Sequence, residues 1–375
     1  MKKNTKYNFL NMYKFIFAII IACFLHYNDH FIKILNLKNH FEQHNITTFL
    51  TKQSSALTEF FFIASGILFF ISYVPKIKNK KMNFQDFFIN RTKRLLPYVA
   101  ITTIIMWILQ IICYNITENV WGSIGTIKFS EVIINILTFG KGILKTQSLN
   151  GPTWYISVLM FCYVIGYFIT KLYIKTNNKL VYIIPLIIGI GIYVSVPFQG
   201  EVIFINCTVA RGLINFFEGI LLHILINQYN NINKKAKTIL KISSLLMIII
   251  SIIILNNPDN FKYIGDIKLL LSFVVFPAII YLCYNSRIIE KISNNKFITY
   301  IGNLSFDIYM MNFIILCSSY IIIKKLNITT EQLENNWKMV WALLTTANII
   351  IPIHISLIRR KIKKFNSNKK TLTTS

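Results

Sequence analysis

One long apolar run contains two ionisable residues whose types and spacing suit chemistry. Residues 9–28 are long enough to span a bilayer, for which about 20 apolar residues suffice, and they include Lys14 near the start and His26 near the end. Ionisable side chains are costly inside a membrane and commonly mark a functional site. The residues also allow a structural interpretation, in which Lys14 extends to the headgroups and His26 lies at the opposite interface.

The chemistry that these two side chains suit is proton transfer and charge stabilisation. Histidine is the side chain that most often removes a proton from a hydroxyl group during attack, and a lysine stabilises a nearby anion. On a helix, Lys14 and His26 lie about 18 Å apart along the axis, which is much of a hydrocarbon core of roughly 30 Å. His30 follows one turn later in a polar segment, and we expect it to be solvated.

The composition indicates which elements must position these residues. Of the 375 residues, 54% are hydrophobic and 14% are charged, whereas a soluble protein has about 25% charged residues. The sequence therefore predicts an all-α, polytopic transmembrane helical bundle. We expect ten spans, at about residues 9–28, 56–75, 95–114, 154–173, 180–198, 209–228, 239–256, 267–284, 304–323 and 338–358.

Basic residues predict the orientation of this bundle. Lys and Arg total 40, against 14 Asp and Glu, and they concentrate in alternate connections between the spans. The positive-inside rule then places both termini in the cytoplasm. Because the charges lie between apolar runs, they suit contact with membrane lipids and argue against a nucleic-acid partner. Residues 1–364 are expected to form one membrane domain, followed by a polar, disordered tail at 365–375.

The cysteines and histidines give no sign of a metal site. The six cysteines are scattered, mostly within apolar runs, and no C-x-x-C pair occurs. His26 and His30, and likewise His40 and His44, are paired at a spacing of four residues, but neither pair belongs to a larger set of ligands. We therefore expect no metal cofactor.

A carboxylate and a pair of small residues occur in the second span, which reads Glu-Phe-Phe-Phe-Ile-Ala-Ser-Gly from Glu59 to Gly66. Glu59 lies at the outer end of that span, on the same side as His26, and would orient the imidazole for general-base work. Ser65 and Gly66 are small enough to let another helix or a ligand approach closely.

Two arginines follow in the next inner connection. Arg91 and Arg94 flank Lys93 and precede the segment Leu-Leu-Pro-Tyr. At a spacing of three residues, the arginines share a face if the segment is helical, and guanidinium groups bind phosphates bidentately. The same charges also suit a topology determinant that contacts anionic lipid headgroups.

Further polar and aromatic residues occur in the later spans. Trp154 begins the fourth span, where an aromatic residue is also typical of a membrane interface. Arg211, Asn215 and Glu218 lie along one face of the sixth span, and an arginine in a membrane needs a carboxylate or a substrate as its partner. The beginning of the ninth span supplies Asp307, Tyr309 and Asn312.

Together these motifs resemble the integral-membrane acyltransferase 3 family, in the family's order, from residue 14 to residue 312. The resemblance implies a bacterial plasma-membrane enzyme that moves an acyl group from acyl-CoA to a hydroxyl of an envelope glycan or lipid-linked sugar, with acetyl-CoA as the expected donor. It implies catalytic roles for His26, Lys14 and Glu59. It also implies donor binding by Arg91, Lys93 and Arg94, and substrate contacts by Ser65, Trp154, Arg211, Glu218, Asp307 and Tyr309.

The sequence departs from the family pattern in two places. Eleven residues, rather than ten, separate Lys14 from His26, and on a regular helix these side chains would lie about 120° apart. A π-helical turn within residues 15–26 would absorb the extra residue; otherwise Lys14 is outside the site, and Tyr13 or Arg211 takes its role. Asn312 replaces the family's histidine, and because an amide does not shuttle protons we assign it no catalytic role.

A transporter or flippase of an anionic lipid-linked sugar is the alternative class of function. Basic connections and Arg211 would steer such a substrate. No internal repeat is evident in the sequence, whereas many transporters are built from repeated halves. The two classes differ in one observable, because only an acyltransferase releases CoA from an acyl donor.

Overall fold

The computed structural model of the chain is built from α-helices joined by short π-helical and 3-10 segments. It describes residues 5–41, 45–122, 127–138, 140, 144, 146, 148–176, 183–195, 205–229, 232–256 and 264–372. The longer helices are α1 (Phe9–Ile20), α3 (Leu57–Lys78), α4 (Phe84–Thr117), α6 (Thr153–Lys175), α7 (Ile183–Ser195), α8 (Cys207–Tyr229), α9 (Lys234–Leu255), α14 (Ser305–Lys325) and α16 (Trp337–Leu372). The shorter ones are α2 (Asn45–Thr48), α5 (Phe129–Ile136), α10 (Ile264–Leu270), α11 (Phe276–Tyr284), α12 (Arg287–Ser293), α13 (Lys296–Gly302) and α15 (Thr330–Asn335).

The prediction of an all-α membrane protein is confirmed. Within the described ranges, nine helical stretches are long and apolar enough to cross a membrane, and a shorter apolar helix lies at Ile183–Val194. That helix corresponds to the span expected at 180–198, of which residues 180–182 and 196–198 lie outside the described residues. The second stretch, Ile46–Lys78, begins earlier than expected, because short helical turns precede α3.

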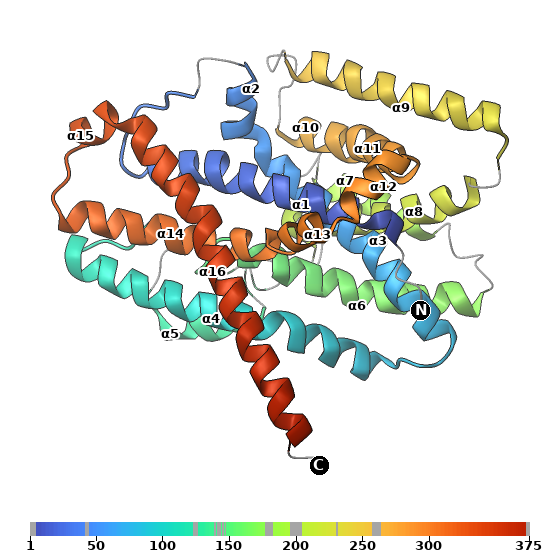
Figure 1. Ribbon diagram of the computed structural model, residues 1–375, viewed down its shortest axis with the longest axis horizontal. Helices are drawn as coiled ribbons and strands as arrows, with labels where there is room; N and C mark the ends of the chain where they lie inside the picture. Colours follow the sequence, from blue (N-terminus) through green and yellow to red (C-terminus); the bar gives the residue numbers. More distant parts are fainter. Residues whose placement is uncertain are drawn as a thin grey trace.

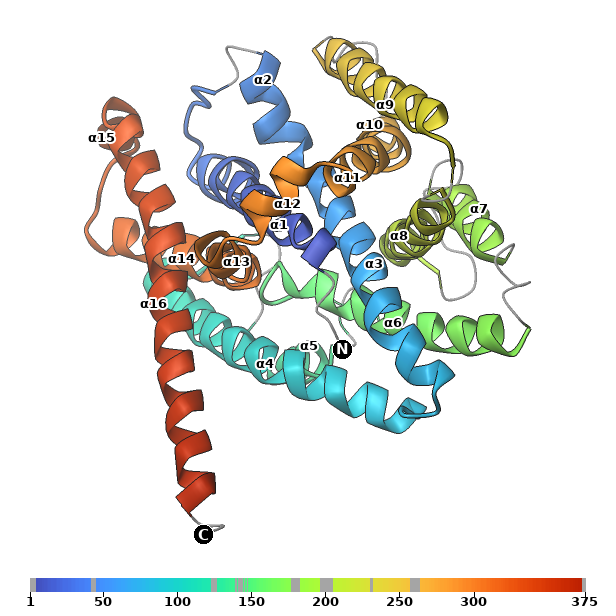
Figure 2. The same cartoon turned by 45° about the vertical axis from the view of Figure 1, so that its right-hand side comes forward.

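The helices that carry the predicted site residues converge on the interior of the bundle. α1 lies between α14 and α3 and packs against both (Figure 1 and Figure 2). α8 packs closely against α3 and α7 and also contacts α6. Residues of α1, α3, α6, α8 and α14 that are far apart in sequence therefore face one another inside the bundle.

Two glycines allow α3 and α8 to pack with their backbones almost in contact. A Cβ atom added to Gly66 would lie 2.0 Å from the carbonyl oxygen of Phe216, and one added to Gly219 would lie 2.1 Å from that of Ile63. Burial between helices gains little free energy in lipid, so close van der Waals contact of this kind is what holds membrane helices together. Gly66 is thus the close-approach position for α8, whereas Ser65 contacts Tyr155 of α6.

The outer surface of the bundle is apolar. α9 lies at its edge, against α11, and exposes Ile242, Leu246, Ile250 and Ile253 (Figure 1). A soluble monomer rarely exposes an apolar face of that length, whereas a lipid-facing helix requires one.

The disordered tail expected at 365–375 stays a prediction, although α16 extends into it. α16 continues to Leu372 and so includes most of residues 365–375. Residues 365–372 include Asn, Ser and Thr, which are poorer helix formers, but the preceding turns of α16 already provide the nucleus that an isolated segment lacks. Residues 373–375 lie outside the described part of the chain.

Candidate active site

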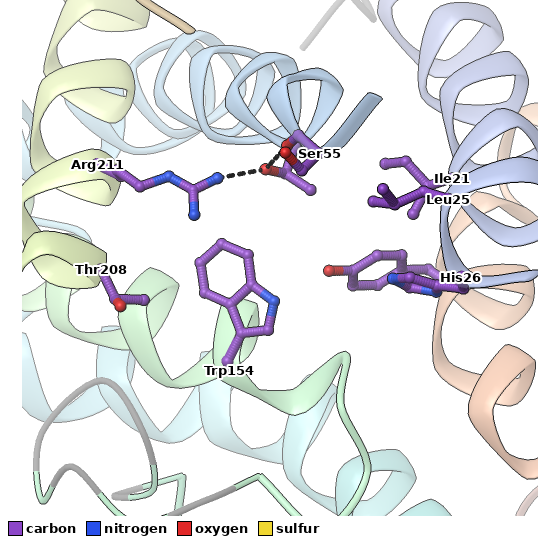
Figure 3. Close-up of a pocket in the computed structure, with 9 residues that line it drawn as sticks. Ile21, Leu25, His26, Ser55, Trp154, Thr208 and Arg211 are labelled. Carbon is purple, nitrogen blue, oxygen red and sulfur yellow. Dashed lines mark hydrogen bonds between the residues drawn. The ribbon is translucent and has the colours of Figure 1, made fainter. Parts of the chain in front are cut away.

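A cavity of about 170 Å³ lies where the turn that follows α1 meets α3, α6, α8 and α14. Four predicted site residues line it, namely His26, Trp154, Arg211 and Tyr309. Figure 3 shows His26 and Arg211 on opposite sides of the cavity, with Trp154 between them. The rest of its lining consists of Ile21, Leu25, Ser55, Thr58 and Thr208.

A π-helical turn interrupts the first span immediately before His26. It covers Ile21–Leu25, and the backbone N–H of His26 donates to the carbonyl oxygen of Ile21, five residues earlier. The turn absorbs one residue, so the rotation between Lys14 and His26 returns to about 20°. The i→i+5 hydrogen bond expected within residues 15–26 is therefore present. Neither Gly nor Pro lies in that segment, which is why the sequence did not locate the turn.

His26 is partly buried and has one hydrogen-bond partner within the described part of the chain. Its Nδ1 lies 2.6 Å from Oδ1 of Asn312 on α14. The ring of Phe313 meets the imidazole edge to face, with centroids 4.9 Å apart. Asn312 thus takes the place beside His26 that we expected Glu59 to occupy, although no catalytic role was expected for this asparagine.

The Glu59 carboxylate is bound to other groups. Nε of Arg211 donates to its Oε1 at 2.7 Å, and Nδ2 of Asn215 donates to its Oε2 at 2.7 Å. Nη2 of Arg211 also donates to the hydroxyl of Thr58 at 2.9 Å. The expected Glu59–His26 pair is therefore wrong, because both carboxylate oxygens already accept from α8. The carboxylate partner of Arg211 is thus Glu59 of α3, and not Glu218, which belongs to the same helix as Arg211.

These contacts fix the Arg211 guanidinium at the wall of the cavity. The group also lies over the ring of Trp154, 5.0 Å from its centroid. A guanidinium held by a carboxylate, a hydroxyl and an indole ring loses little further freedom when it binds a ligand. The cavity therefore combines an immobilised cation, a nearby imidazole and hydroxyl groups, a set that suits a hydroxylated substrate.

Lys14 does not line this cavity. It lies close enough to Arg94 of α4 for the two positive charges to interact. Within the described residues neither side chain forms an ion pair with a carboxylate. Two cations near one another that lack carboxylate partners attract an anion. Because Lys14 lies outside the cavity, Lys14 and His26 occupy separate positions along the first span, and the expectation that they share one cavity is not met.

The two arginines of the R-x-x-R motif have different surroundings, although both belong to α4. Arg91 is buried, and its guanidinium lies between the rings of Tyr73 and Tyr163, at 4.6 Å and 4.3 Å from their centroids. Its Nε has no hydrogen-bond partner among the residues that the structure describes. Lys93 and Arg94 are exposed. The motif thus presents two exposed cations beside one that is held between aromatic rings.

Three of the predicted substrate-contact residues lie away from the lining of the cavity. The Ser65 hydroxyl pairs with that of Tyr155 at 3.1 Å. Both oxygens of Asp307 accept from Nη2 of Arg359 at 2.6 Å. Glu218 is buried, and neither of its carboxylate oxygens is hydrogen-bonded to a described residue. Their expected contacts with substrate remain predictions.

His30 is not the solvated residue that the polar segment indicated. It belongs to a second π-helical turn, Asn28–Ile32. Its ring packs on Phe313, with centroids 4.5 Å apart, and approaches Trp121 at 5.9 Å. The polar residues around it misled the prediction, because the helix continues past them instead of ending in a turn.

The sequence also missed several groups around the cavity. Ser55, Thr58 and Thr208 supply hydroxyls, and the only available signal was their position beside Glu59 or Arg211. No described group of three or more His, Cys, Asp or Glu is arranged to hold a metal.

Comparison with known proteins gives one finding. The sequence pattern of a family described as an acyltransferase domain, acyltransferase 3, matches residues 7–357. No curated protein and no solved structure matches the chain. The matched range includes every residue of the cavity and of the R-x-x-R motif.

Proposed function

This chain belongs to the acyltransferase 3 family, and from that membership we propose that it moves an acyl group, expected to be acetyl, from acyl-CoA to a hydroxyl of an envelope glycan. The observation that carries the proposal is His26, which lies at the wall of an interior cavity opposite the Arg211 guanidinium (Figure 3). An imidazole at that position can take a proton from a bound hydroxyl group, and a fixed guanidinium can hold the molecule that bears it.

The proposed reaction starts with the acceptor hydroxyl. His26 removes its proton as the hydroxyl oxygen attacks the thioester carbonyl, which forms the new C–O bond. Collapse of the tetrahedral intermediate breaks the C–S bond. The CoA thiolate leaves and takes up the proton, so the products are the O-acylated glycan and free CoA.

Arg211 is proposed to bind the acceptor. Arg211 lines the cavity, and its side chain stays 21% exposed despite the contacts with Glu59, Thr58 and Trp154. Guanidinium N–H groups are donors for sugar hydroxyls, and Trp154 offers an apolar ring edge beside them. The proposed role of Glu59 is accordingly to hold Arg211.

The donor is proposed to bind at the other end of the first span. Lys14 of α1 and Arg94 of α4 lie near one another and lack carboxylate partners within the described residues. The exposed Lys93, next to Arg94, adds a third cation to this site. The phosphates of CoA are the complementary anions. Lys14 would then act on the donor, about 18 Å along the helix axis from His26.

Aromatic contacts support a single basic end of the bundle. Arg91 lies over Tyr73 near the end of α3, Lys6 over Tyr284 at the end of α11, and Arg359 over Tyr98 of α4. Clustered Lys and Arg mark the cytoplasmic side of a membrane protein. The proposed location is the plasma membrane of a bacterium, with acyl-CoA reaching the basic end from the cytoplasm.

The experiment that tests the function uses purified protein in lipid vesicles with radiolabelled acetyl-CoA. Wild-type protein is expected to release CoA thiol, and cells that make it should gain alkali-labile acetyl groups on envelope glycans. His26→Gln should lose both signals at an unchanged protein level, whereas His354→Gln, an exposed residue of α16, should keep them. Absence of CoA release by wild-type protein, together with movement of a lipid-linked sugar, would instead favour a flippase.

A further inference from the structure

We propose that Asn312 is a positioning residue that fixes the tautomer of His26, holding the ring proton on Nδ1 and leaving Nε2 as the base. The inference rests on the proposed function, in which His26 accepts the proton of the acceptor. It adds a role for a residue that is an amide where a second imidazole would be expected.

The orientation of the Asn312 amide follows from its other partners. The side chain is fully buried, and its Nδ2 lies 3.3 Å from the carbonyl oxygen of Ala22 and 3.0 Å from Oδ1 of Asn348. A backbone carbonyl only accepts hydrogen bonds. The amide nitrogen must therefore face Ala22, which turns Oδ1 toward His26.

The orientation of the amide decides the protonation of the ring. Oδ1 of Asn312 is an acceptor 2.6 Å from Nδ1 of His26, so Nδ1 must carry a hydrogen. A neutral imidazole has one ring proton. Nε2 therefore keeps its lone pair, and it has no hydrogen-bond partner among the described residues. His26 lines the cavity, so that lone pair is free to accept a proton from a ligand.

The π-helical turn supplies the acceptor that orients Asn312. In a regular α-helix the N–H of His26 would bond to the carbonyl of Ala22, four residues earlier. Here it bonds to Ile21 instead, which releases the Ala22 carbonyl for Asn312. The next carbonyl, that of Cys23, accepts from Nε1 of Trp341 on α16 at 2.9 Å. α14 and α16 thus bind two successive carbonyls of the turn that carries His26.

The test compares Asn312→Leu, Asn312→Asp and Asn303→Leu in purified protein. Asn303 is exposed, and within the described part of the chain its side chain bonds only to the Thr299 carbonyl, four residues earlier. We expect Asn312→Leu to lower kcat by about 10²-fold, the size of a general-base contribution, with the KM for acetyl-CoA changed by less than about twofold. Asn303→Leu should leave both constants unchanged.

The aspartate variant gives a readout that a merely structural role would not change. A carboxylate still accepts from Nδ1 but also stabilises the imidazolium, so the acidic limb of the kcat/KM–pH profile should move to higher pH. The other titratable or charged groups that face the ring are the same in both proteins. They are His30 at 5.8 Å and Tyr309 at 6.2 Å between centroids, and Arg211 across the cavity. If Asn312→Leu does not fold, this shift decides the matter.

The outcomes separate this inference from the proposed function. Wild-type kcat in Asn312→Leu, or an unmoved acidic limb in Asn312→Asp, combined with an inactive His26→Gln, would overturn the positioning role and leave the function intact. Full activity of His26→Gln would overturn the proposed base itself.

Discussion

Arg211 of α8 and Glu59 of α3 form an ion pair in which Nη2 and Oε1 are 2.6 Å apart and the carboxylate is 1% exposed. The pair joins the two helices that pack most closely, and it holds the guanidinium at the wall of the cavity. A carboxylate buried in this way is costly to leave without its partner, so each residue constrains the other.

Replacing Glu59 should therefore affect stability and acceptor binding together. Glu59→Ala leaves the half-buried Arg211 guanidinium without its carboxylate. We expect a loss of up to about 3 kcal/mol of unfolding free energy, the lower end for a buried pair, seen as a lower midpoint of thermal unfolding in detergent. Glu331→Ala, on the exposed part of α15, is the matched control. An unchanged midpoint in Glu59→Ala would show that the pair contributes nothing to stability.

The sequence predicted which residues were unusual but not which of them would meet. Glu59 and His26 both lie toward one end of their spans, so position along the membrane axis made them plausible partners. What decides the pairing is the rotation of each helix, and that follows from packing, such as the approach of α3 to α8 at Gly66 and Gly219. A single sequence carries no signal for this rotation.

The spans themselves were predictable, because hydropathy depends on local composition. α3 and α8 begin and end within a few residues of the expected spans. The π-helical turn at Ile21–Leu25 was accessible only through the spacing of Lys14 and His26, since the residues in the turn are uniformly apolar. Asn312 was recognised as a departure, but its contact with His26 depends on the tertiary arrangement of α1 and α14.

His30 should contribute to packing rather than to the reaction. Its ring lies against Phe313 and near Trp121 and is absent from the cavity lining. We expect His30→Ala to lower the thermal midpoint while kcat per folded molecule stays within about twofold of wild type, because truncating a packed ring removes contacts without touching the base. A loss of kcat as large as that of His26→Gln would place His30 in the reaction.

Arg94 and Arg91 should give different kinetic results. Arg94 is exposed and has no carboxylate partner within the described residues, so Arg94→Ala should raise the KM for acetyl-CoA by about tenfold, the loss of one charge-assisted contact. Arg94→Lys should recover little of this, because lysine lacks the bidentate fork. The KM of the wild type should also rise with salt. Equal KM values for Arg94→Ala and the wild type would exclude Arg94 from the donor site.

Arg91 lies between Tyr73 and Tyr163, so Arg91→Ala should lower stability as well as donor binding. The comparison of thermal midpoints for the two alanine variants measures this difference.

The glycine contacts between α3 and α8 give a direct test of the packing. Gly66→Ala would place a methyl group 2.0 Å from the Phe216 carbonyl oxygen, and backbone cannot move aside as a side chain can. We expect a strong loss of folded protein and of activity. Gly189→Ala on α7 is the matched control, because no atom lies within 4 Å of its added Cβ, and it should match the wild type or be more stable. Normal folding of Gly66→Ala would contradict the observed distance between the helices.

The last prediction concerns the π-helical turn and the extra residue before His26. Inserting one alanine after Cys23 adds about 100° of rotation. The π-helical turn already absorbs one extra residue and cannot absorb a second. His26 would then face away from the cavity, and acetyl transfer should be lost. Deleting Cys23 should have the milder effect, because the segment can become a regular α-helix with His26 still on the cavity side. Some activity would be lost even then, since the N–H of His26 would reclaim the carbonyl that now binds Asn312. Measuring CoA release per amount of folded protein in both variants checks the order. Greater activity in the insertion than in the deletion would show that the turn does not set the direction of His26.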